Sequence, residues 1–540
     1  MPQYASQSPP PLEVWSWIRH LPSTRDDSWP DSDPTLELAG TRDVAKAQKD
    51  GSKKSILLKA ERTRVPGGEA ASAITFSVFL EGFSQEKPLW VSNPCSLVSK
   101  PFFPDLLLQL LQETISRAPT VSGSHNGYQI DARFFSRCFE SISLSSDQYL
   151  SQVYNLAFLG RLFWLCVFDT PSEVGSLYFQ LLSSNINSLS CNSAKKSTFL
   201  RSIGCDGELY LMRSLGYISS KWLILRELQS VPFRPPPSPP LGFSYAKSSH
   251  GLLILKAYTP VLSMDRTCYN EQQDPYARIE AKESLLKYAL GHQQLEAVVQ
   301  FEYAVSSFQD YVKVRLRVDN IRLHVNRLGF RHDEDGKGIE FMDERHFPSR
   351  ARVWVGPESG SSLISLGRST RDAEREIETQ RSVKSSLEEN SKKFPFVKSK
   401  TKTAAKTRVK NWRWDQDAEG SVCIFDAVLC DSFSGAEVVG SWKAGSSSGD
   451  QTSLRNGFRK RYSGASRAFT KKGGVVFAGD EYGEEVSWRL DKEMEGSVMK
   501  WRMGGKVWLT YWPNEFKTTY SETRCVEWCE DIEIPLLVSS

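Results

Sequence analysis

The sequence predicts an α+β fold, in which an α-rich N-terminal domain precedes an antiparallel β-sandwich (jelly-roll-like) C-terminal domain with a long charged loop insertion. Three observations lead to this prediction. Helical patterns dominate residues 1–229, a proline-rich stretch interrupts the chain at 230–249, and short β-branched or aromatic runs fill residues 250–540. Many short strands separated by turn residues are typical of sandwiches and barrels. The chain has 540 residues, enough for about two to four domains.

The N-terminal domain, residues 1–229, is predicted to be mostly helical with a few strands. Its longest apolar run, Tyr154–Phe168, contains Arg161 and spans about 15 residues, fewer than the roughly 20 that a membrane-spanning helix needs. We therefore expect a buried helix there. Thr170, Pro171 and Glu173 match a helix start, with a capping residue and a capping box. The expected elements are, in chain order, a helix over 12–21, strands over 55–63 and 74–83, and helices over 104–118 and within 146–229.

The linker, residues 230–249, is rich in proline, which lacks a backbone N–H and favours extended polyproline geometry. Arg234, Pro237 and Pro240 follow the spacing R-x-x-P-x-x-P, which docks into aromatic grooves of partner proteins. The stretch fits a stiff interdomain linker, and it also fits a polyproline docking segment.

The C-terminal domain, residues 250–540, contains runs that alternate or concentrate β-branched and aromatic residues. A mixed-charge segment poor in apolar residues interrupts these runs and predicts a disordered insertion over about 365–408. The expected strands lie within 251–263, 295–305, 311–325, 350–356, 421–429, 473–479, 485–490, 497–503, 506–512 and 523–537.

A basic tract, Lys392–Trp414, holds nine Lys or Arg and neither Asp nor Glu. Cations that neutralise phosphates and aromatics that stack on bases are the two requirements of nucleic-acid binding. A solvated loop and a nuclear-localisation or anionic-surface patch explain the same composition. The residues of this candidate patch are Lys398, Lys400, Lys402, Lys406, Arg408 and Lys410.

The C-terminal domain is also rich in tryptophan, and indoles either fill a core or present a flat surface to sugars and lipids. Trp508 and Trp512 share a strand parity opposite to that of Val507, Leu509 and Tyr511. We expect Trp508 and Trp512 to be the exposed aromatics of this region.

No motif assigns catalytic, cofactor-binding or metal-binding residues. The segment His332–Glu344 resembles a calcium loop but places Lys337 where an oxygen ligand belongs. The Gly445–Gly449 match to G-x-S-x-G lies in a Ser/Gly-rich stretch without the required strand and helix. Cys525 and Cys529 lie four residues apart on one expected strand, roughly 13 Å apart and too distant to form a disulfide.

Composition and the N-terminus favour a soluble intracellular protein of the cytoplasm or nucleus. The ten cysteines are scattered, unlike those of a secreted disulfide scaffold. The first residues lack the apolar stretch of a signal peptide, and we expect no transmembrane segment. The net charge of +4 is small for this length, so charge arguments depend on local clusters.

Two segments carry a resemblance to known sequences. They are PPPLEVWSWIRHLP near the start and, from Val498, VMKWRMGGKVWLTYWPNEFKTTYSETRCVEWCEDIEIPLL near the end. They resemble an uncharacterised plant protein family of similar length, matched over much of the chain. The resemblance implies no activity, cofactor or catalytic residue.

These observations lead to three functional hypotheses. The first is a non-enzymatic intracellular binding or scaffold protein with an unknown protein partner and no cofactor. The second is a carbohydrate- or lipid-directed β-sandwich protein, which would need a concave site with exposed tryptophans and converging carboxylates. The third is a nucleic-acid-associated protein that binds through the basic tract.

Overall fold

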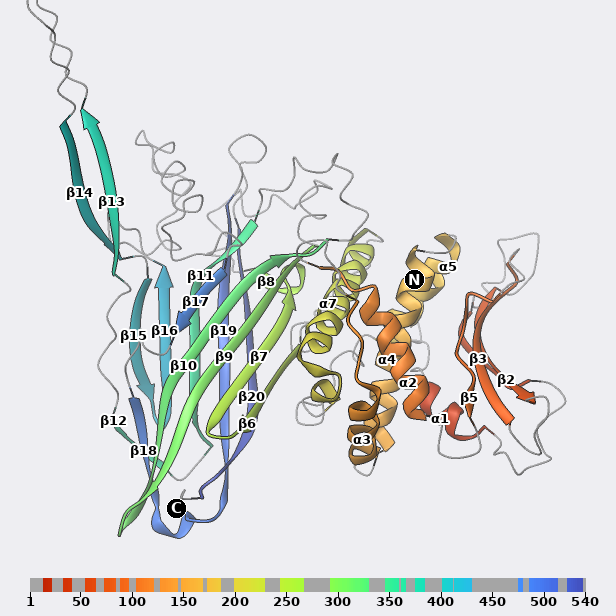
Figure 1. Cartoon of the computed structure of the whole chain (residues 1–540), viewed down its shortest axis with the longest axis horizontal. Coiled ribbons are helices and arrows are strands. Elements are labelled where there is room, and N and C mark those ends of the chain that lie inside the picture. The colour runs from red at the N-terminus through yellow and green to blue at the C-terminus, as the bar shows by residue number, and fades with distance from the viewer. Residues whose placement is uncertain are drawn as a thin grey trace, which may run out of the picture.

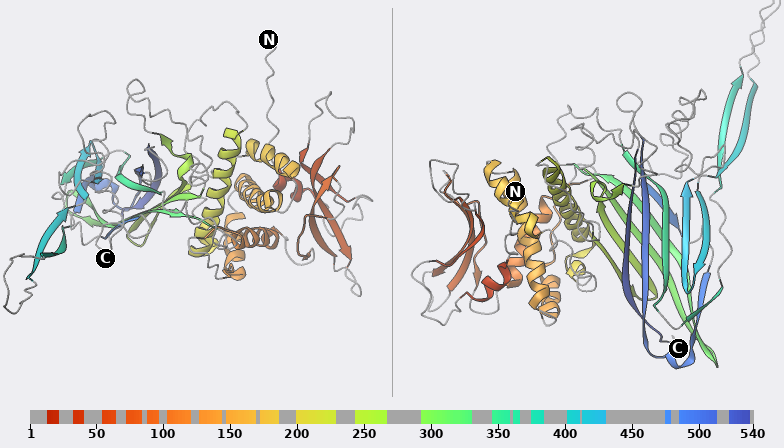
Figure 2. Two further views of the ribbon diagram at one scale, coloured as in Figure 1. Left: turned by 90° about the horizontal axis from the view of Figure 1, so that it is seen from above. Right: turned by 180° about the vertical axis from the view of Figure 1, so that it is seen from behind.

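The computed structural model combines three antiparallel sheets, a separate hairpin and a group of helices (Figure 1). The helices lie between the small N-terminal sheet and the two larger sheets, as the views in Figure 2 confirm. The structure describes residues 13–21, 33–40, 54–64, 72–83, 88–96, 103–120, 127–143, 147–168, 172–185, 199–228, 243–266, 292–329, 345–358, 361–365, 374–383, 401–410, 412–429, 474–478, 485–512 and 522–537.

The N-terminal sheet has five strands in the order β1-β2-β3-β4, with β5 also paired to β3. Apolar residues at alternate positions of β2, such as Ile56, Leu58 and Ala60, are fully buried because successive side chains of a strand point to opposite faces. The strands are β1 (Thr35–Gly40), β2 (Ser55–Arg64), β3 (Ser72–Glu81), β4 (Trp90–Val91) and β5 (Cys95–Ser96).

The helices bury their apolar faces against this sheet and against one another in a single core. The predicted buried helix over Tyr154–Phe168 is confirmed as part of α4, in which Leu159 and Leu162 are fully buried. The helix predicted after Thr170 begins at Ser172. The helices are α1 (Val14–Arg19), α2 (Phe103–Ser116), α3 (Ala132–Ser143), α4 (Asp147–Phe168), α5 (Ser172–Asn185) and α7 (Gly204–Leu228).

The larger sheet has seven strands in the order β12-β18-β10-β9-β7-β6, and β17 pairs with β10. The last part of the predicted linker is a strand, because β6 occupies 243–249 and pairs with β7. The strands are β6 (Phe243–Ser249), β7 (Leu252–Pro260), β9 (Gln293–Ser307), β10 (Tyr311–Arg327), β12 (Ser361–Ser365), β17 (Gly474–Ala478) and β18 (Glu485–Asp491), and the short 3₁₀ helices are η2 (Val261–Ser263) and η6 (Lys492–Met494).

The other large sheet has six strands in the order β15-β16-β11-β19-β20-β8. Its inward side chains form one core with those of the seven-stranded sheet, and Trp488 and Trp501 meet there edge to face at 4.9 Å. The strands are β8 (Asp265–Arg266), β11 (Arg345–Pro357), β15 (Trp412–Glu419), β16 (Val422–Leu429), β19 (Val498–Trp512) and β20 (Glu522–Pro535).

The two strands predicted over 497–503 and 506–512 are one continuous strand, β19. The prediction treated the Gly504–Gly505 pair as a break, but these glycines make room for two indoles on opposite faces. A Cβ atom on Gly504 would overlap the Trp354 ring, and one on Gly505 would lie 2.7 Å from the Trp528 ring. The small residues therefore serve side-chain packing within the strand rather than a turn.

The α+β class agrees with this architecture, but the jelly-roll-like part of the prediction is not confirmed. Consecutive strands such as β9 and β10, or β19 and β20, pair as hairpins within one sheet. The hairpin of β13 (Glu374–Val383) and β14 (Thr401–Lys410) overlaps the predicted insertion over about 365–408 and projects from the two large sheets (Figure 1).

Candidate functional site

A stripe of polar side chains runs along one face of α2. Asp105, Gln109, Gln112 and Glu113 are spaced so that they share this face, since residues three, four or seven apart are neighbours on a helix. The opposite face is apolar and buried, with Leu106, Leu107, Leu110, Leu111 and Ile115. The polar stripe thus faces away from the core of the helical part.

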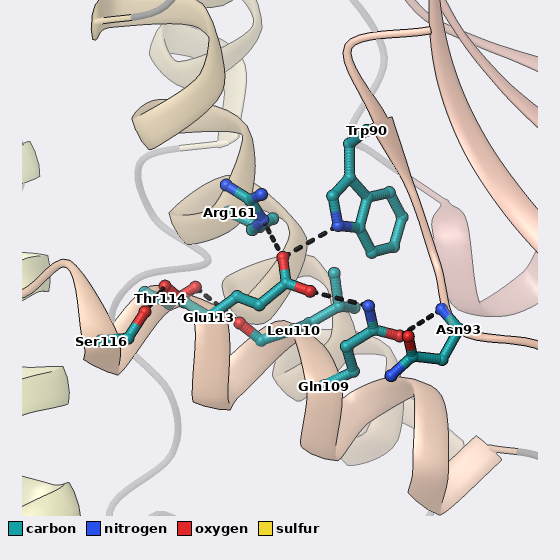
Figure 3. A network of polar contacts seen from close by, with 8 residues as sticks. All are labelled: Trp90, Asn93, Gln109, Leu110, Glu113, Thr114, Ser116 and Arg161. Carbon is teal, nitrogen blue, oxygen red and sulfur yellow. Dashed lines mark hydrogen bonds and ion pairs between the residues drawn. The ribbon is translucent and has the colours of Figure 1, made fainter. Parts of the chain in front are cut away.

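A close crossing of α2 and α4 brings a charged pair to this stripe. Gly160 lets Thr114 approach, because a Cβ atom at position 160 would lie 3.1 Å from the Thr114 methyl group. The next residue, Arg161, donates from Nε to Glu113 Oε2 at 2.5 Å, and Trp90 Nε1 donates to the same oxygen at 2.9 Å (Figure 3). The Glu113 carboxylate therefore ties β4 and α4 to α2.

Two glutamines hold the walls beside α2. Gln109 donates to Glu113 Oε1 at 2.7 Å and accepts from the Asn93 backbone N–H at 2.9 Å, as Figure 3 shows. Gln112 donates to the Tyr128 carbonyl and accepts from the Ile130 N–H, both at 2.7 Å. The amides thus fix the segment after β4 and the segment before α3, and a space remains between them.

That space is the α2 groove, a cavity of about 460 Å³. It is lined by Asn93, Pro94, Cys95, Asp105, Leu108, Gln109, Gln112, Glu113, Gln129 and Ile130. Asp105 is exposed in the first turn of α2, where the helix dipole favours a carboxylate, and it has no ion pair or hydrogen bond within the described residues. Burial, with a smaller contribution from the charge of Asp105, raises the pKa of Cys95 to about 11, so this thiol stays protonated.

A second polar cluster joins α7 to the outer face of the seven-stranded sheet. Glu208, buried on α7, accepts hydrogen bonds from the hydroxyls of Tyr245 and Tyr258, and from Lys256 Nζ at 3.0 Å. Burial and the charge of Glu208 raise the pKa of both tyrosines, so both hydroxyls remain donors. We call this set the Glu208 cluster.

A neighbouring ion pair strengthens the same junction. Arg213 of α7 contacts Glu296 of β9 with both Nε, at 2.8 Å, and Nη2, at 3.3 Å. Asn326 of β10 donates to Glu296 Oε2 at 2.5 Å. The helical part and the strand part are therefore joined by charged side chains whose positions are fixed on both sides.

Trp508 lies half-buried on the outer face of the six-stranded sheet, while Val507 and Leu509 point into the core. The Arg350 guanidinium lies 5.0 Å and the Lys506 ammonium 5.4 Å from its ring centroid. Trp512 ends β19, and its side chain lies outside the described part of the structure. Exposure of both indoles as a binding surface stays a prediction.

Carboxylates offset the cations on this face. Burial acts to raise the pKa of Asp426, but hydrogen bonds from Arg350 and Arg352 outweigh it and lower the pKa below its usual value. Lys506 pairs with Glu527 at 2.7 Å. These pairs cross neighbouring strands and support their register.

The basic tract is described where it forms β14 and, from Trp412, the start of β15. The candidate cations that are described lie on β14. The register of β14 places Lys406, Arg408 and Lys410 directly opposite Glu378, Glu376 and Glu374 of β13. Lys402 lies opposite Ser382. The remaining predicted candidates, Lys398, Lys400, Arg234, Pro237 and Pro240, and the calcium-like segment 332–344, lie outside the described residues.

Among the described residues, no group of three or more His, Cys, Asp or Glu side chains is placed to hold a metal ion. In the same part of the chain, no helix is both long and apolar enough to cross a membrane.

No family model and no curated protein matches the chain. Two of the solved structures that match show distant similarity to this chain. A Clostridium perfringens delta-toxin chain is 9% identical with a TM-score of 0.24, over 54% of this chain and 96% of that one. The Clostridium perfringens NetB toxin in its membrane-inserted form is 10% identical with a TM-score of 0.17, over 55% and 99% of the two chains. Similarity at this level carries no argument about function.

Sequence reasoning missed both the α2 groove and the Glu208 cluster. The spacing of Asp105, Gln109 and Gln112 was a readable signal, because it marks a polar helix face beside an apolar one. The hydrogen-bond partners of Glu208 could not be predicted from the sequence, because Tyr245 and Tyr258 lie 37 and 50 residues away along the chain.

Proposed function

We propose that the chain is a non-enzymatic intracellular binding or scaffold protein whose α2 groove accepts a basic side chain of a partner polypeptide. The observation that carries the proposal is the exposed carboxylate of Asp105, which has no ion pair within the described residues and lies beside a preformed cavity of about 460 Å³. Cavities of this size are typical of ligand sites, and a pre-organised site lowers the entropic cost of binding.

The walls of the groove match an aliphatic chain that ends in a cation. Leu108, Pro94 and Ile130 provide apolar contact, and Gln129 adds an exposed amide. Glu113 is already neutralised by Arg161, so Asp105 supplies the net negative charge. A lysine or arginine side chain buries its stem against such walls and places its charge at the carboxylate.

Other carboxylates support a binding rather than a catalytic role. Glu113, Glu208, Glu296 and Asp426 each accept from cationic side chains on other elements, and so join parts of the fold. Free cysteines with raised pKa values, about 12 for both Cys166 and Cys423 because of burial, support the proposed intracellular location. We further propose that the two large sheets form a sandwich, which their shared core supports.

Peptide binding to the full chain tests the groove. The probes are two peptide pools with randomised flanks, one with a fixed lysine and the other with norleucine, which has the same stem without the charge. We expect the lysine pool to bind more tightly and Asp105→Asn to weaken it about tenfold, as expected for a charged hydrogen bond. Asp310→Asn, an exposed carboxylate outside the groove, is the control. Equal binding of both pools would refute the proposal.

A further inference from the structure

The outer face of the seven-stranded sheet carries two cations in directly opposed positions. Lys313 of β10 lies opposite Arg489 of β18, and both side chains point away from the core. Like charges placed directly opposite in a sheet are destabilising. Lys313 has no ion pair or hydrogen bond within the described part of the chain. Four residues further along β10, by contrast, Arg317 pairs with Glu302 at 2.7 Å.

The residues around this pair leave the cations accessible. On the β9 side, Ser306 lies opposite Lys313. This small neutral residue takes the position in which a carboxylate would neutralise the charge, as Glu302 does for Arg317. Lys313 and Arg489 form what we call the β10–β18 patch.

An aromatic stack holds Arg489 in place. Its guanidinium carbon lies 4.4 Å from the Tyr311 ring centroid, and Phe308 stacks on the same ring at 4.7 Å with an interplanar angle of 14°. Two groups this close to one ring occupy opposite faces. Arg489 is therefore pre-organised, while its planar fork of N–H groups keeps its affinity for a phosphate or carboxylate.

We propose that the β10–β18 patch binds a single phosphate group carried by a side chain of a partner peptide. A phosphate monoester brings nearly two negative charges and three acceptor oxygens, which match the Arg489 fork and the Lys313 ammonium. Bound between them, it removes their repulsion. Phe308, 45% exposed at the β9–β10 turn, offers apolar contact to a residue beside the phosphorylated one.

The surrounding charges favour one phosphate over an extended polyanion. Glu302, Asp310 and Asp491 are exposed close to the patch on β9, at the β9–β10 turn and on β18. A nucleic-acid backbone or an anionic membrane would extend over these carboxylates and be repelled, whereas a single phosphate reaches only the two cations. The inference is independent of the α2 groove.

The test uses the full chain and two peptide pools with randomised flanks, one with a fixed phosphothreonine and the other with threonine. We expect tighter binding of the phosphorylated pool, competition by inorganic phosphate, and a loss of about tenfold or more in Lys313→Met and Arg489→Met. Arg317→Met, on the same strand face, is the control and should retain binding.

Thermal melting separates a binding role from a structural one. Without phosphate, Lys313→Met should melt no lower than the parent chain, because it removes a repulsion. Inorganic phosphate should raise the melting temperature of the parent and not that of the variant. Equal binding of both pools, an equal loss in Arg317→Met, or tighter binding to anionic vesicles or single-stranded nucleic acid would overturn the assignment.

Discussion

Glu208→Ala tests whether the junction between α7 and the seven-stranded sheet stabilises the whole molecule. The substitution removes the acceptor for two tyrosine hydroxyls and the counter-charge of Lys256, whose ammonium lies 3.0 Å from the carboxylate. Lys256 then remains near the junction as an unpaired charge. Breaking a buried pair from one side is costly for this reason.

The distance between Glu208 and Lys256 gives the expected loss in the free energy of unfolding. At 3.0 Å and an effective dielectric constant of about 20, the bare attraction is roughly 5.5 kcal/mol, and desolvation cancels much of it. Loss of one partner from a buried pair costs about 3–5 kcal/mol. Because Lys256 keeps 21% of its side chain exposed, we expect the lower end, about 3 kcal/mol, or roughly 150-fold in the unfolding equilibrium constant.

Urea unfolding of the full chain, followed by tryptophan fluorescence, measures this change. The control is Arg317→Ala, which breaks a pair of similar length, 2.7 Å, whose side chains are each 52% exposed. That pair should contribute less than about 1 kcal/mol. The double variant Glu208→Ala/Lys256→Ala should recover part of the loss, because it removes the unpaired charge. Equal midpoints for Glu208→Ala and Arg317→Ala would refute the reasoning.

Three further predictions concern other parts of the fold. Asp426→Asn should make the stability of the protein less dependent on pH in the acid range. The lowered pKa of Asp426 contributes stability that is present above the ordinary value of 3.8 and is lost as the pH falls through the folded-state value. The urea midpoints of the parent chain and the variant, measured against pH, should therefore differ most near neutral pH. Gly504→Ala should cost about 1–3 kcal/mol by overlap with Trp354, measured by thermal melting, while Gly127→Ala, with open space around it, should change little. If the basic tract binds phosphates, the affinity for single-stranded nucleic acid should depend less steeply on salt concentration after Lys398, Lys400, Lys402 and Lys406 are replaced with Ala. An unchanged slope of affinity against salt concentration would contradict that role.

Local patterns in the sequence were enough to predict individual elements. The alternation in β10 and the helical period of α2 are properties of neighbouring residues, and both elements lie where these patterns indicate. The break predicted inside β19 failed for a different reason. Gly504 and Gly505 look like a turn in isolation, and only the indoles of Trp354 and Trp528 from neighbouring strands explain them.

The candidate sites depended on contacts that the sequence does not display. Arg161 reaches Glu113 across 48 residues because Gly160 allows two helices to approach closely. The opposition of Lys313 and Arg489 depends on strand order, since β18 pairs with β10 from a distant part of the chain. The sequence shows which side chains are present, and the fold determines which of them come into contact.

The contact between β6 and β20 has a consequence for self-association. β6 ends the seven-stranded sheet, and an uncovered end strand invites pairing with another molecule. Here Ser244 of β6 donates to Glu530 of β20 at 2.6 Å, so the other sheet shields this edge. Among the described strands of the two large sheets, β12 and β15 lie at the ends opposite to β6 and β8. Between the two large sheets, aggregation of a partly unfolded chain should therefore begin at β12 and β15, and charged or proline substitutions there should suppress it.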